Sequence, residues 1–275
     1  MSVESQDRKV NLSTGSLWPL FSFASSQWSL EVAQKAGFDQ IEILSGYSVI
    51  REFKRNQSLS IDQQFIGSFH ENWREDALAE NTYQLKTDTN FGIRASVRAQ
   101  IIRSVFPPIQ ETRRLAQGLE KVYGLPFVFH WKDNLKHLDR NSILEVHPYL
   151  GMGPEKIVDF VQNNPKISGL VIDLSERKFG DYLKKQAIPE SSWKDVFDIF
   201  APYLQEVHFQ MGNKEEIKEV ISQNHEGSLG QRLSYLKKLN REIPIVAEVN
   251  PGILKNFTGG RNELFTKVST FIRKA

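Results

Sequence analysis

The sequence predicts an α/β fold, a single (β/α)8 TIM barrel that forms one domain over residues 1–275. Short apolar runs of strand length recur along the chain, and most precede an amphipathic helical pattern, which indicates a parallel sheet. There are eight such runs, and 275 residues shared among them give about 34 residues per unit, the size expected of this barrel. No Pro/Gly-rich linker or low-complexity tract divides the chain.

Each strand and helix is expected where the apolar pattern has the matching period. The strands are expected at residues 9–14, 39–44, 65–70, 126–130, 142–147, 168–173, 205–210 and 243–248. Helical patterns cover residues 28–36, 47–53, 91–105, 109–123, 154–162, 191–203, 228–239 and 262–272. Ser29 is a candidate N-cap, and Pro154 suits a first helical position. Gly37 and Gly124 stand where left-handed residues would end helices.

Composition and charge exclude several classes of protein. The chain is 40% hydrophobic and 25% charged, which is ordinary for a globular protein, and its net charge of +2 gives no support for a nucleic-acid-binding surface. The sequence has no cysteine, so a metal site would use His, Asp or Glu. The polar segment Met1–Lys9 and the lack of a long apolar run predict a cytoplasmic protein without a membrane span.

Polar side chains close four of the expected apolar strands, and each comes from a different strand. These residues are Glu145, Asp173, His208 and Glu248. Because catalytic groups of such barrels lie at the carboxyl ends of the strands, we expect the four to converge there. Three carboxylates would repel one another unless a cation lay between them, which favours a divalent metal site. For each residue alone, simple strand capping or pairing with a nearby Lys or Arg remains an alternative.

The histidines strengthen the prediction of a site. His70, His130 and His208 fall within or at the end of expected strands, and His147 follows Glu145 by two residues. A lone histidine in such a place is more often hydrogen-bonded in the core than a ligand, but three at strand ends favour a functional cluster.

Several segments together resemble a known family. They are SLEVAQKAGFDQIEI, LEVH, LVIDLS, EVHFQ, IVAEVN and HEGSLGQ. In this order they are similar to the strand ends of the xylose isomerase-like TIM barrels, the superfamily of sugar and sugar-phosphate isomerases and epimerases that also contains nucleases of the endonuclease IV type. The resemblance covers nearly the whole chain and places Glu42 at the acidic position of the second strand.

The resemblance implies roles for the strand-end residues. Glu145, Asp173, His208 and Glu248 match the ligands of one Mn, Mg, Co or Zn ion, and Glu145 and Glu248 match the groups that transfer protons. His70 and His130 match histidines that hold a further ion in the nucleases, which leaves a second ion near them as an option.

Two departures from the family pattern bear on the activity. Glu176 stands three residues after Asp173, where many members have histidine, and Met211 stands three residues after His208, where an aspartate is usual. Both changes remove ligands of the third zinc site and argue against nuclease activity, and they leave open a divergent or inactive member.

The resemblance therefore implies a divalent-metal-dependent sugar or sugar-phosphate isomerase or epimerase that works through an enediolate. Substrate-binding candidates are His70, His130, His147, Trp18, Lys132 and Arg177. A metal-dependent phosphoesterase of the endonuclease IV type and a non-catalytic ligand-binding barrel are the alternatives. The expected partner is a small carbohydrate, with neither nucleic acid nor membrane, and the resemblance allows a homodimer. The identity of the sugar and the native metal stay open.

Overall fold

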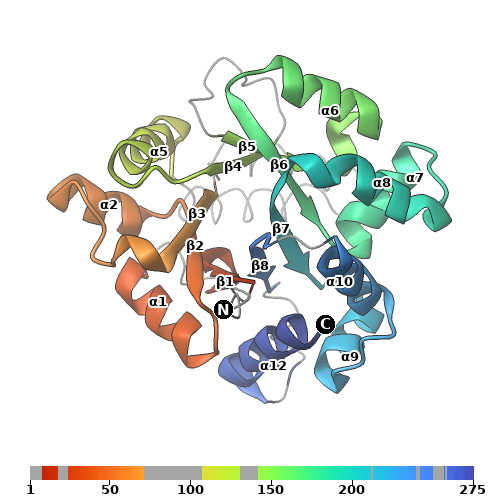
Figure 1. The fold of residues 1–275 in the computed structure, drawn as a ribbon. Coiled ribbons are helices and arrows are strands. Elements are labelled where there is room, and N and C mark those ends of the chain that lie inside the picture. The colour runs from red at the N-terminus through yellow and green to blue at the C-terminus, as the bar shows by residue number, and fades with distance from the viewer. Residues whose placement is uncertain are drawn as a thin grey trace, which may run out of the picture.

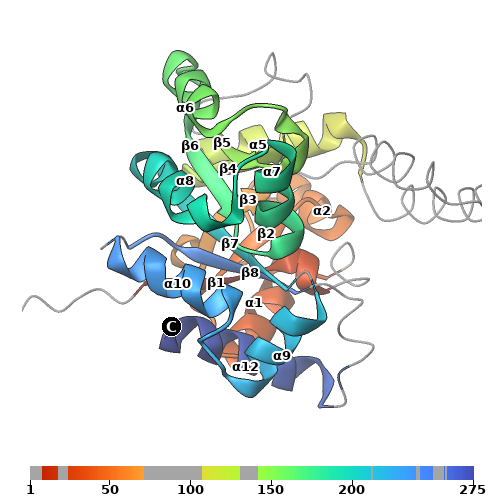
Figure 2. The same cartoon turned by 90° about the vertical axis from the view of Figure 1, so that its right-hand side faces the viewer.

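The chain forms a closed barrel of eight parallel strands. The computed structural model describes residues 8–17, 24–70, 107–130, 142–211, 213–239, 242–249, 257 and 259–275. Each strand pairs with the next along the chain, and β8 pairs with β1 to close the sheet. Figure 1 shows the ring of strands with the helices outside it, and Figure 2 shows the same barrel from the side. The predicted (β/α)8 fold is confirmed.

All eight expected strands are present, with boundaries that shift by at most two residues. They are β1 Val10–Ser13, β2 Gln40–Leu44, β3 Ile66–His70, β4 Phe127–His130, β5 Ser142–Val146, β6 Ile167–Asp173, β7 Leu204–Gln210 and β8 Ile245–Glu248. Because the strands are parallel, their carboxyl ends meet at one mouth of the barrel.

The described helices confirm most of the helical predictions. They are α1 Ser26–Lys35, α2 Tyr47–Asn56, α5 Ile109–Tyr123, α6 Pro154–Asn163, α7 Asp181–Lys185, α8 Trp193–Phe200, α9 Lys214–Ser222, α10 Ser228–Lys238 and α12 Gly260–Lys274. The sequence did not predict α7 or α9, and the expected helix at 91–105 lies outside the described residues. A capping box between Asn213 and Glu216 begins α9.

The predicted helix ends hold with one exception. Ser29 is not the N-cap of α1, because the helix begins one turn earlier: the side chain of Ser25 accepts a hydrogen bond from the backbone N–H of Trp28 at 3.2 Å. Ser29 lies inside the helix. Gly124 follows α5 in the left-handed conformation with φ of 63°, and Pro154 is the first residue of α6, as predicted.

The apolar core lies mainly between the strands and the surrounding helices, and the inside of the barrel is largely polar. Among the described residues, a small separate group of buried apolar side chains, Val128, Ile143 and Val171, lies apart from that core. Buried polar residues of the strands include Ser13, Glu42, Ser68, Glu206 and His208. Because buried charges are costly unless paired, this polar interior needs its own network.

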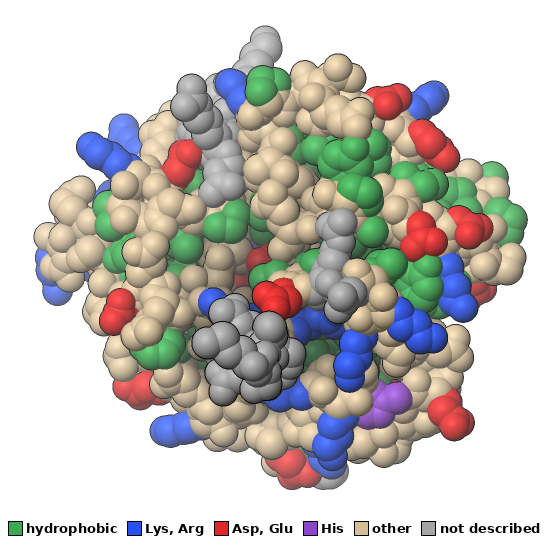
Figure 3. Space-filling model, in the orientation of Figure 1, with side chains coloured by type: hydrophobic (Ala, Val, Ile, Leu, Met, Phe, Trp, Pro, Cys, Tyr) green, Lys and Arg blue, Asp and Glu red, His purple; other side chains and the backbone are tan. Residues whose placement is uncertain are grey.

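Two surface properties complete the description of the fold. None of the described helices combines the length and apolar content needed to cross a bilayer. On the face of the molecule shown in Figure 3, acidic and basic side chains are interspersed, in keeping with the net charge of +2.

Candidate functional site

The four predicted metal ligands come from neighbouring strands on one side of the barrel. Glu145 lies on β5, Asp173 ends β6, His208 lies on β7 and Glu248 ends β8. The first three are buried, with 0–1% of their surface exposed, and the Glu248 side chain is 22% exposed. The acidic strand ends therefore lead from the barrel interior to its mouth, where solvent and small molecules have access.

His208 is held by two carboxylates on one edge of its ring. Its Nε2 atom lies 3.1 Å from Oε1 of Glu206 and 3.3 Å from Oε2 of Glu42. On the other edge, Nδ1 lies 3.7 Å from Oε1 of Glu248 and has no hydrogen-bond partner among the described residues. Such an arrangement fixes the ring and leaves the second nitrogen to face the mouth.

The electrostatics around His208 are those of a shared charge. Burial alone would lower the pKa of His208, but the carboxylates of Glu248, Glu42 and Glu206 together raise it well above its ordinary value. Burial would raise the pKa of Glu42, and the charges of His208 and His70 outweigh this and lower it.

Glu206 behaves in the opposite way from Glu42. Burial, together with the negative charge of Glu42, raises the pKa of Glu206 in spite of its hydrogen bond to His208. The two carboxyl groups that contact Nε2 of His208 therefore have pKa values shifted in opposite directions.

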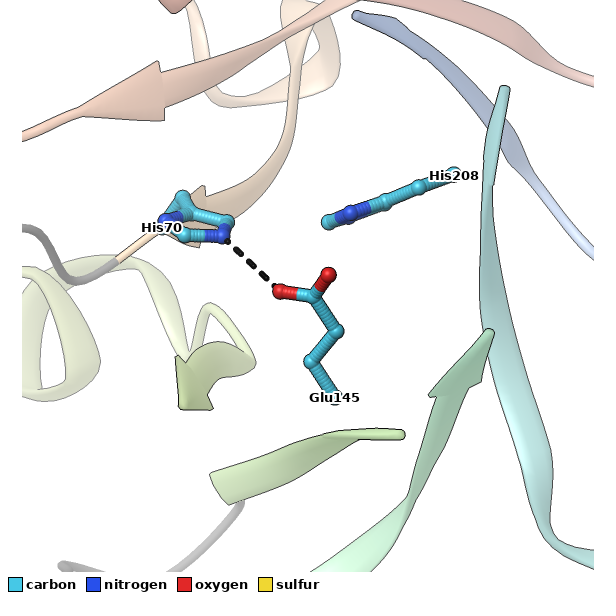
Figure 4. Close-up of side chains that lie close together, drawn as sticks. All are labelled: His70, Glu145 and His208. Atoms are coloured by element: carbon cyan, nitrogen blue, oxygen red, sulfur yellow. Dashed lines mark ion pairs between the residues drawn. The ribbon is translucent and has the colours of Figure 1, made fainter. Parts of the chain in front are cut away.

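Glu145 lies between two imidazole rings. Figure 4 shows His70 of β3 and His208 of β7 directed toward the Glu145 side chain from two sides. The Nε2 atom of His70 lies 3.6 Å from Oε2 of Glu145, and the two ring centroids are 5.7 Å apart. His70 is 3% exposed, so this contact is buried.

Ligand atoms converge in two overlapping groups among the described residues. One group is His70, Glu145 and His208, and the other is Glu42, His208 and Glu248; within each, one ligand atom per residue lies within 4.8 Å of the others. The structure thus brings Glu145 and Glu248 each close to His208, in two separate groups. Asp173 belongs to neither group, and Glu42, which the resemblance placed only as a strand-end acid, joins the second.

Asp173 and Lys178 complete the charged cluster. Oδ1 of Asp173 accepts a hydrogen bond from the backbone N–H of Ser175 at 2.7 Å, and Oδ2 has no hydrogen-bond partner among the described residues. Burial, with a further contribution from Glu248, raises the pKa of Asp173 to about 6 against the opposing charge of Lys178.

Lys178 is a further member of the cluster that the sequence pattern did not predict. The ε-ammonium group donates a hydrogen bond to Oε1 of Glu145 at 3.2 Å. Lys178 stands five residues after Asp173, in a π-helical turn, Glu176–Gly180, that follows β6. The alternating pattern of a strand could not place its side chain, whereas the adjacent Arg177, a predicted substrate-binding residue, is exposed.

The residues that depart from the family pattern have structural partners. The Glu176 carboxylate forms ion pairs with Arg232 at 3.1 Å and with Lys184 at 2.8 Å. Met211 is buried in the core. The Glu176 carboxylate is thus paired with two basic side chains. Met211, three residues after His208, packs in the apolar core instead of serving as a ligand.

Other candidate residues have different positions. His130 ends β4, and its side chain, like the whole of Trp18 and Lys132, lies outside the described residues. His147 is half-buried and directly follows β5, and its carbonyl accepts a hydrogen bond from Leu150. His225, from the HEGSLGQ segment, stacks on Phe271 at a ring distance of 4.3 Å and so has a packing role.

The donor set fits a divalent cation of the harder kind. It offers the carboxylates of Glu145, Asp173 and Glu248 and one imidazole nitrogen, a mixture typical of Mn, Mg, Co or Zn sites. Oδ2 of Asp173 and Nδ1 of His208 are buried and without hydrogen-bond partners among the described residues, as ligand atoms would be. The hydrogen bond between Nε2 of His208 and Glu206 is the support that metal-binding histidines usually have.

Comparison with known proteins gives no match to a family model or to a curated protein. Among solved structures, D-allulose 3-epimerase from Methylomonas sp. is 14% identical over 98% of both chains, with a TM-score of 0.47. The same enzyme in complex with D-allulose is 15% identical over 98% of this chain and 97% of that chain, with a TM-score of 0.47. A sugar phosphate isomerase/epimerase from Parabacteroides distasonis is 14% identical over 100% of this chain and 99% of that chain, with a TM-score of 0.43. The strand order of the chain itself defines its class, the (β/α)8 barrels.

Proposed function

We propose that the chain is a divalent-metal-dependent sugar epimerase or isomerase in which Glu145 and Glu248 transfer protons. The observation that carries this proposal is the position of these two carboxylates on either side of His208. Glu145 reaches the cluster from β5 with His70, and Glu248 reaches it from β8 through Nδ1 of His208. In the closed ring, β5 and β8 are separated by β6 and β7 on one side and by β1–β4 on the other.

This placement favours epimerisation. A hydroxy-carbonyl sugar bound between β5 and β8 would present one face of its acidic carbon to Glu145 and the other face to Glu248. One carboxylate then removes the proton from carbon, and the other returns a proton to the opposite face, which inverts the centre. Isomerisation would instead return the proton to the neighbouring carbon.

A divalent ion held by Glu145, Asp173, His208 and Glu248 would supply Lewis-acid chemistry that lowers the pKa of the C–H bond beside the carbonyl group. The residues of the chain provide the rest. The ring of His70, whose Nε2 lies 3.6 Å from Oε2 of Glu145, would bind a sugar hydroxyl group. Gln210 donates to Oε2 of Glu248 at 3.4 Å and so orients the second carboxylate.

The phosphoesterase alternative loses support. That activity in the resembled family depends on additional ligands after the sixth and seventh strands. Here Glu176 is paired with Arg232 and Lys184, and Met211 is 2% exposed in the core. Neither residue is available to extend the cluster to a third ion.

The test is turnover of a panel of aldoses, ketoses and their phosphates by the Mn²⁺-loaded protein. We expect one ketose or aldose to be converted to its epimer, and Glu145→Gln and Glu248→Gln each to lower kcat by about 10²- to 10⁴-fold, the usual contribution of general acid–base catalysis. Glu215→Gln is the matched control, because this side chain is 79% exposed on α9. Turnover that persists in both site variants would contradict the assignment.

A further inference from the structure

The ammonium group of Lys178 lies among the carboxylates to which a metal ion would bind. Its Nζ atom is 3.2 Å from Oε1 of Glu145, whose side chain is 1% exposed, and the Lys178 side chain is 21% exposed. Burial alone would lower the pKa of Lys178, but the charges of Glu145, Asp173 and Glu248 outweigh it and raise the pKa. Three of the four proposed ligands therefore act on one positive charge that belongs to the chain.

The turn that carries Lys178 is held in place independently of its ammonium group. Oγ of Ser175 accepts the backbone N–H of Lys178 at 3.3 Å, and Oδ1 of Asp173 accepts that of Ser175 at 2.7 Å. The backbone N–H of Glu176 donates to Oε1 of Glu216 at 2.7 Å. The base of the lysine side chain is thus fixed at the barrel mouth, beside β6.

The Glu176 side chain anchors the same turn from outside the site. Its carboxylate pairs with the buried Arg232, which also donates to the backbone carbonyl of Leu174 at 2.5 Å. The π-helical form of this turn is a conformation that often accompanies functional positions. Only the flexible four-carbon stem of Lys178 is left to move, and it can carry the ammonium group toward or away from Glu145.

An ammonium group and a divalent ion that bind the same carboxylate group weaken each other's binding. Each would repel the other at contact distance, in an interior where charges are poorly screened. An ion that takes Oε1 of Glu145 must first remove its hydrogen bond from Lys178. The net affinity for the ion is then the intrinsic affinity reduced by the cost of displacing the ammonium group.

We propose that Lys178 is a built-in competitor for the divalent metal ion: its ammonium group neutralises Glu145 before the ion binds and leaves it when it does. This inference rests on the proposed function, because it presumes the metal site described above. Lys178, in the π-helical turn, would then control the affinity of the barrel mouth for the metal ion. Removing the lysine charge then strengthens metal binding, whereas removing any of the carboxylates weakens it.

The test is calorimetric titration of Mn²⁺ into the chelator-treated full chain and its variants. Lys178→Met is expected to bind Mn²⁺ about tenfold tighter or more, because the competing charge is gone. Lys178→Gln is expected to do the same with a polar side chain, which guards against a folding defect in the first variant. Lys178→Arg keeps the charge and is expected to remain a weak binder.

Lys184→Met is the matched control. This lysine comes shortly after the turn, but its ammonium group pairs with Glu176 and is 63% exposed, so its loss is expected to leave Mn²⁺ affinity unchanged. Equal affinities for the wild type, Lys178→Met and Lys178→Gln would overturn the competition while leaving metal-dependent catalysis intact. Binding in none of the proteins would overturn both the competition and the metal requirement. Binding only after loss of the lysine charge would support the competition and contradict a metal-dependent wild type.

Discussion

The Nε2 atom of His208 lies 3.1 Å from Oε1 of Glu206 inside the barrel, two residues earlier on the same strand. Both side chains are buried, with 0% and 3% exposed surface. The contact fixes one edge of the imidazole ring against β7 and leaves Nδ1 on the side of Glu248. Glu206 is therefore a positioning residue for the proposed metal ligand.

Replacing Glu206 by Gln keeps the size of the side chain and removes its carboxylate. We expect the Kd for Mn²⁺ to rise about 10- to 100-fold, as is usual when the hydrogen-bond partner of a metal-binding histidine is altered. Calorimetric titration measures the change, and near-ultraviolet circular dichroism checks that the fold is intact. Glu215→Gln on the surface should bind as the wild type does. Unchanged affinity in Glu206→Gln would show that this contact does not position His208 for a metal.

Asp173 gives the protein a specific pH dependence. Its folded-state pKa of about 6 lies above the ordinary 3.8, so the folded state binds the proton more tightly than the unfolded state. The free energy of unfolding of the metal-free wild type should therefore fall as the pH rises from about 4 to about 6, by about 3 kcal/mol from this group.

Asp173→Asn removes the titrating carboxyl group. The difference in the free energy of unfolding between this variant and the wild type therefore shows the pH dependence due to Asp173. Relative to the wild type, the variant should gain stability between pH 4.5 and 7.5, as measured by urea unfolding in the presence of a chelator. A stability difference that stays constant across this range would mean that burial does not raise the pKa of Asp173.

Arg232 anchors the turn that carries Lys178. Its side chain is 3% exposed and pairs with Glu176, which is 26% exposed. Arg232→Met should lower the free energy of unfolding by about 2 kcal/mol, less than for a fully buried pair because Glu176 keeps contact with water. Lys184→Met removes the exposed partner of the same carboxylate and should produce no measurable change. Thermal or urea unfolding of the two variants separates the outcomes, and equal effects would refute a structural role for the inner pair.

Gly230 is the third residue of α10 and lies where the preceding chain passes close by. A Cβ atom there would lie 2.3 Å from the backbone carbonyl oxygen of His225, a contact that requires the backbone to move. Gly230→Ala should therefore destabilise the fold by more than about 2 kcal/mol in urea unfolding. The comparison is Gly153→Ala, where the nearest atom is 3.9 Å away and φ is −70°, which should be close to neutral. Similar stabilities of the two variants would contradict the predicted clash.

The barrel and most of its strand-end residues could be predicted from the sequence because both depend on local pattern. Runs such as LVID and IVAE are apolar up to a terminal acid, and a parallel sheet carries Asp173 and Glu248 to one mouth. The alternation of β7 could also have identified Glu206, which shares a face with His208. Ser25 and Ser29 show the limit of this reasoning, since either serine could cap a helix and only the backbone conformation selects Ser25.

Lys178 could not be placed in the same way. Its position depends on a turn outside any strand, and that turn is held by Glu216 and Arg232, residues 40 and 56 positions from Glu176 in the chain. The contact of Glu42 with His208 likewise comes from closure of the barrel, which brings β2 and β7 together across its interior.

If Glu145 and Glu248 transfer protons on opposite faces of a sugar, the product carries a proton from solvent. Incubation in D₂O measures this exchange directly. Ketoses and aldoses are incubated with the Mn²⁺-loaded protein and followed by proton NMR. The wild type should place one deuterium from solvent on the carbon beside the carbonyl group of the accepted sugar and form its epimer. Glu145→Gln and Glu248→Gln should both lose this conversion. Epimer formation without deuterium incorporation, or incorporation that survives in both variants, would contradict proton transfer by Glu145 and Glu248.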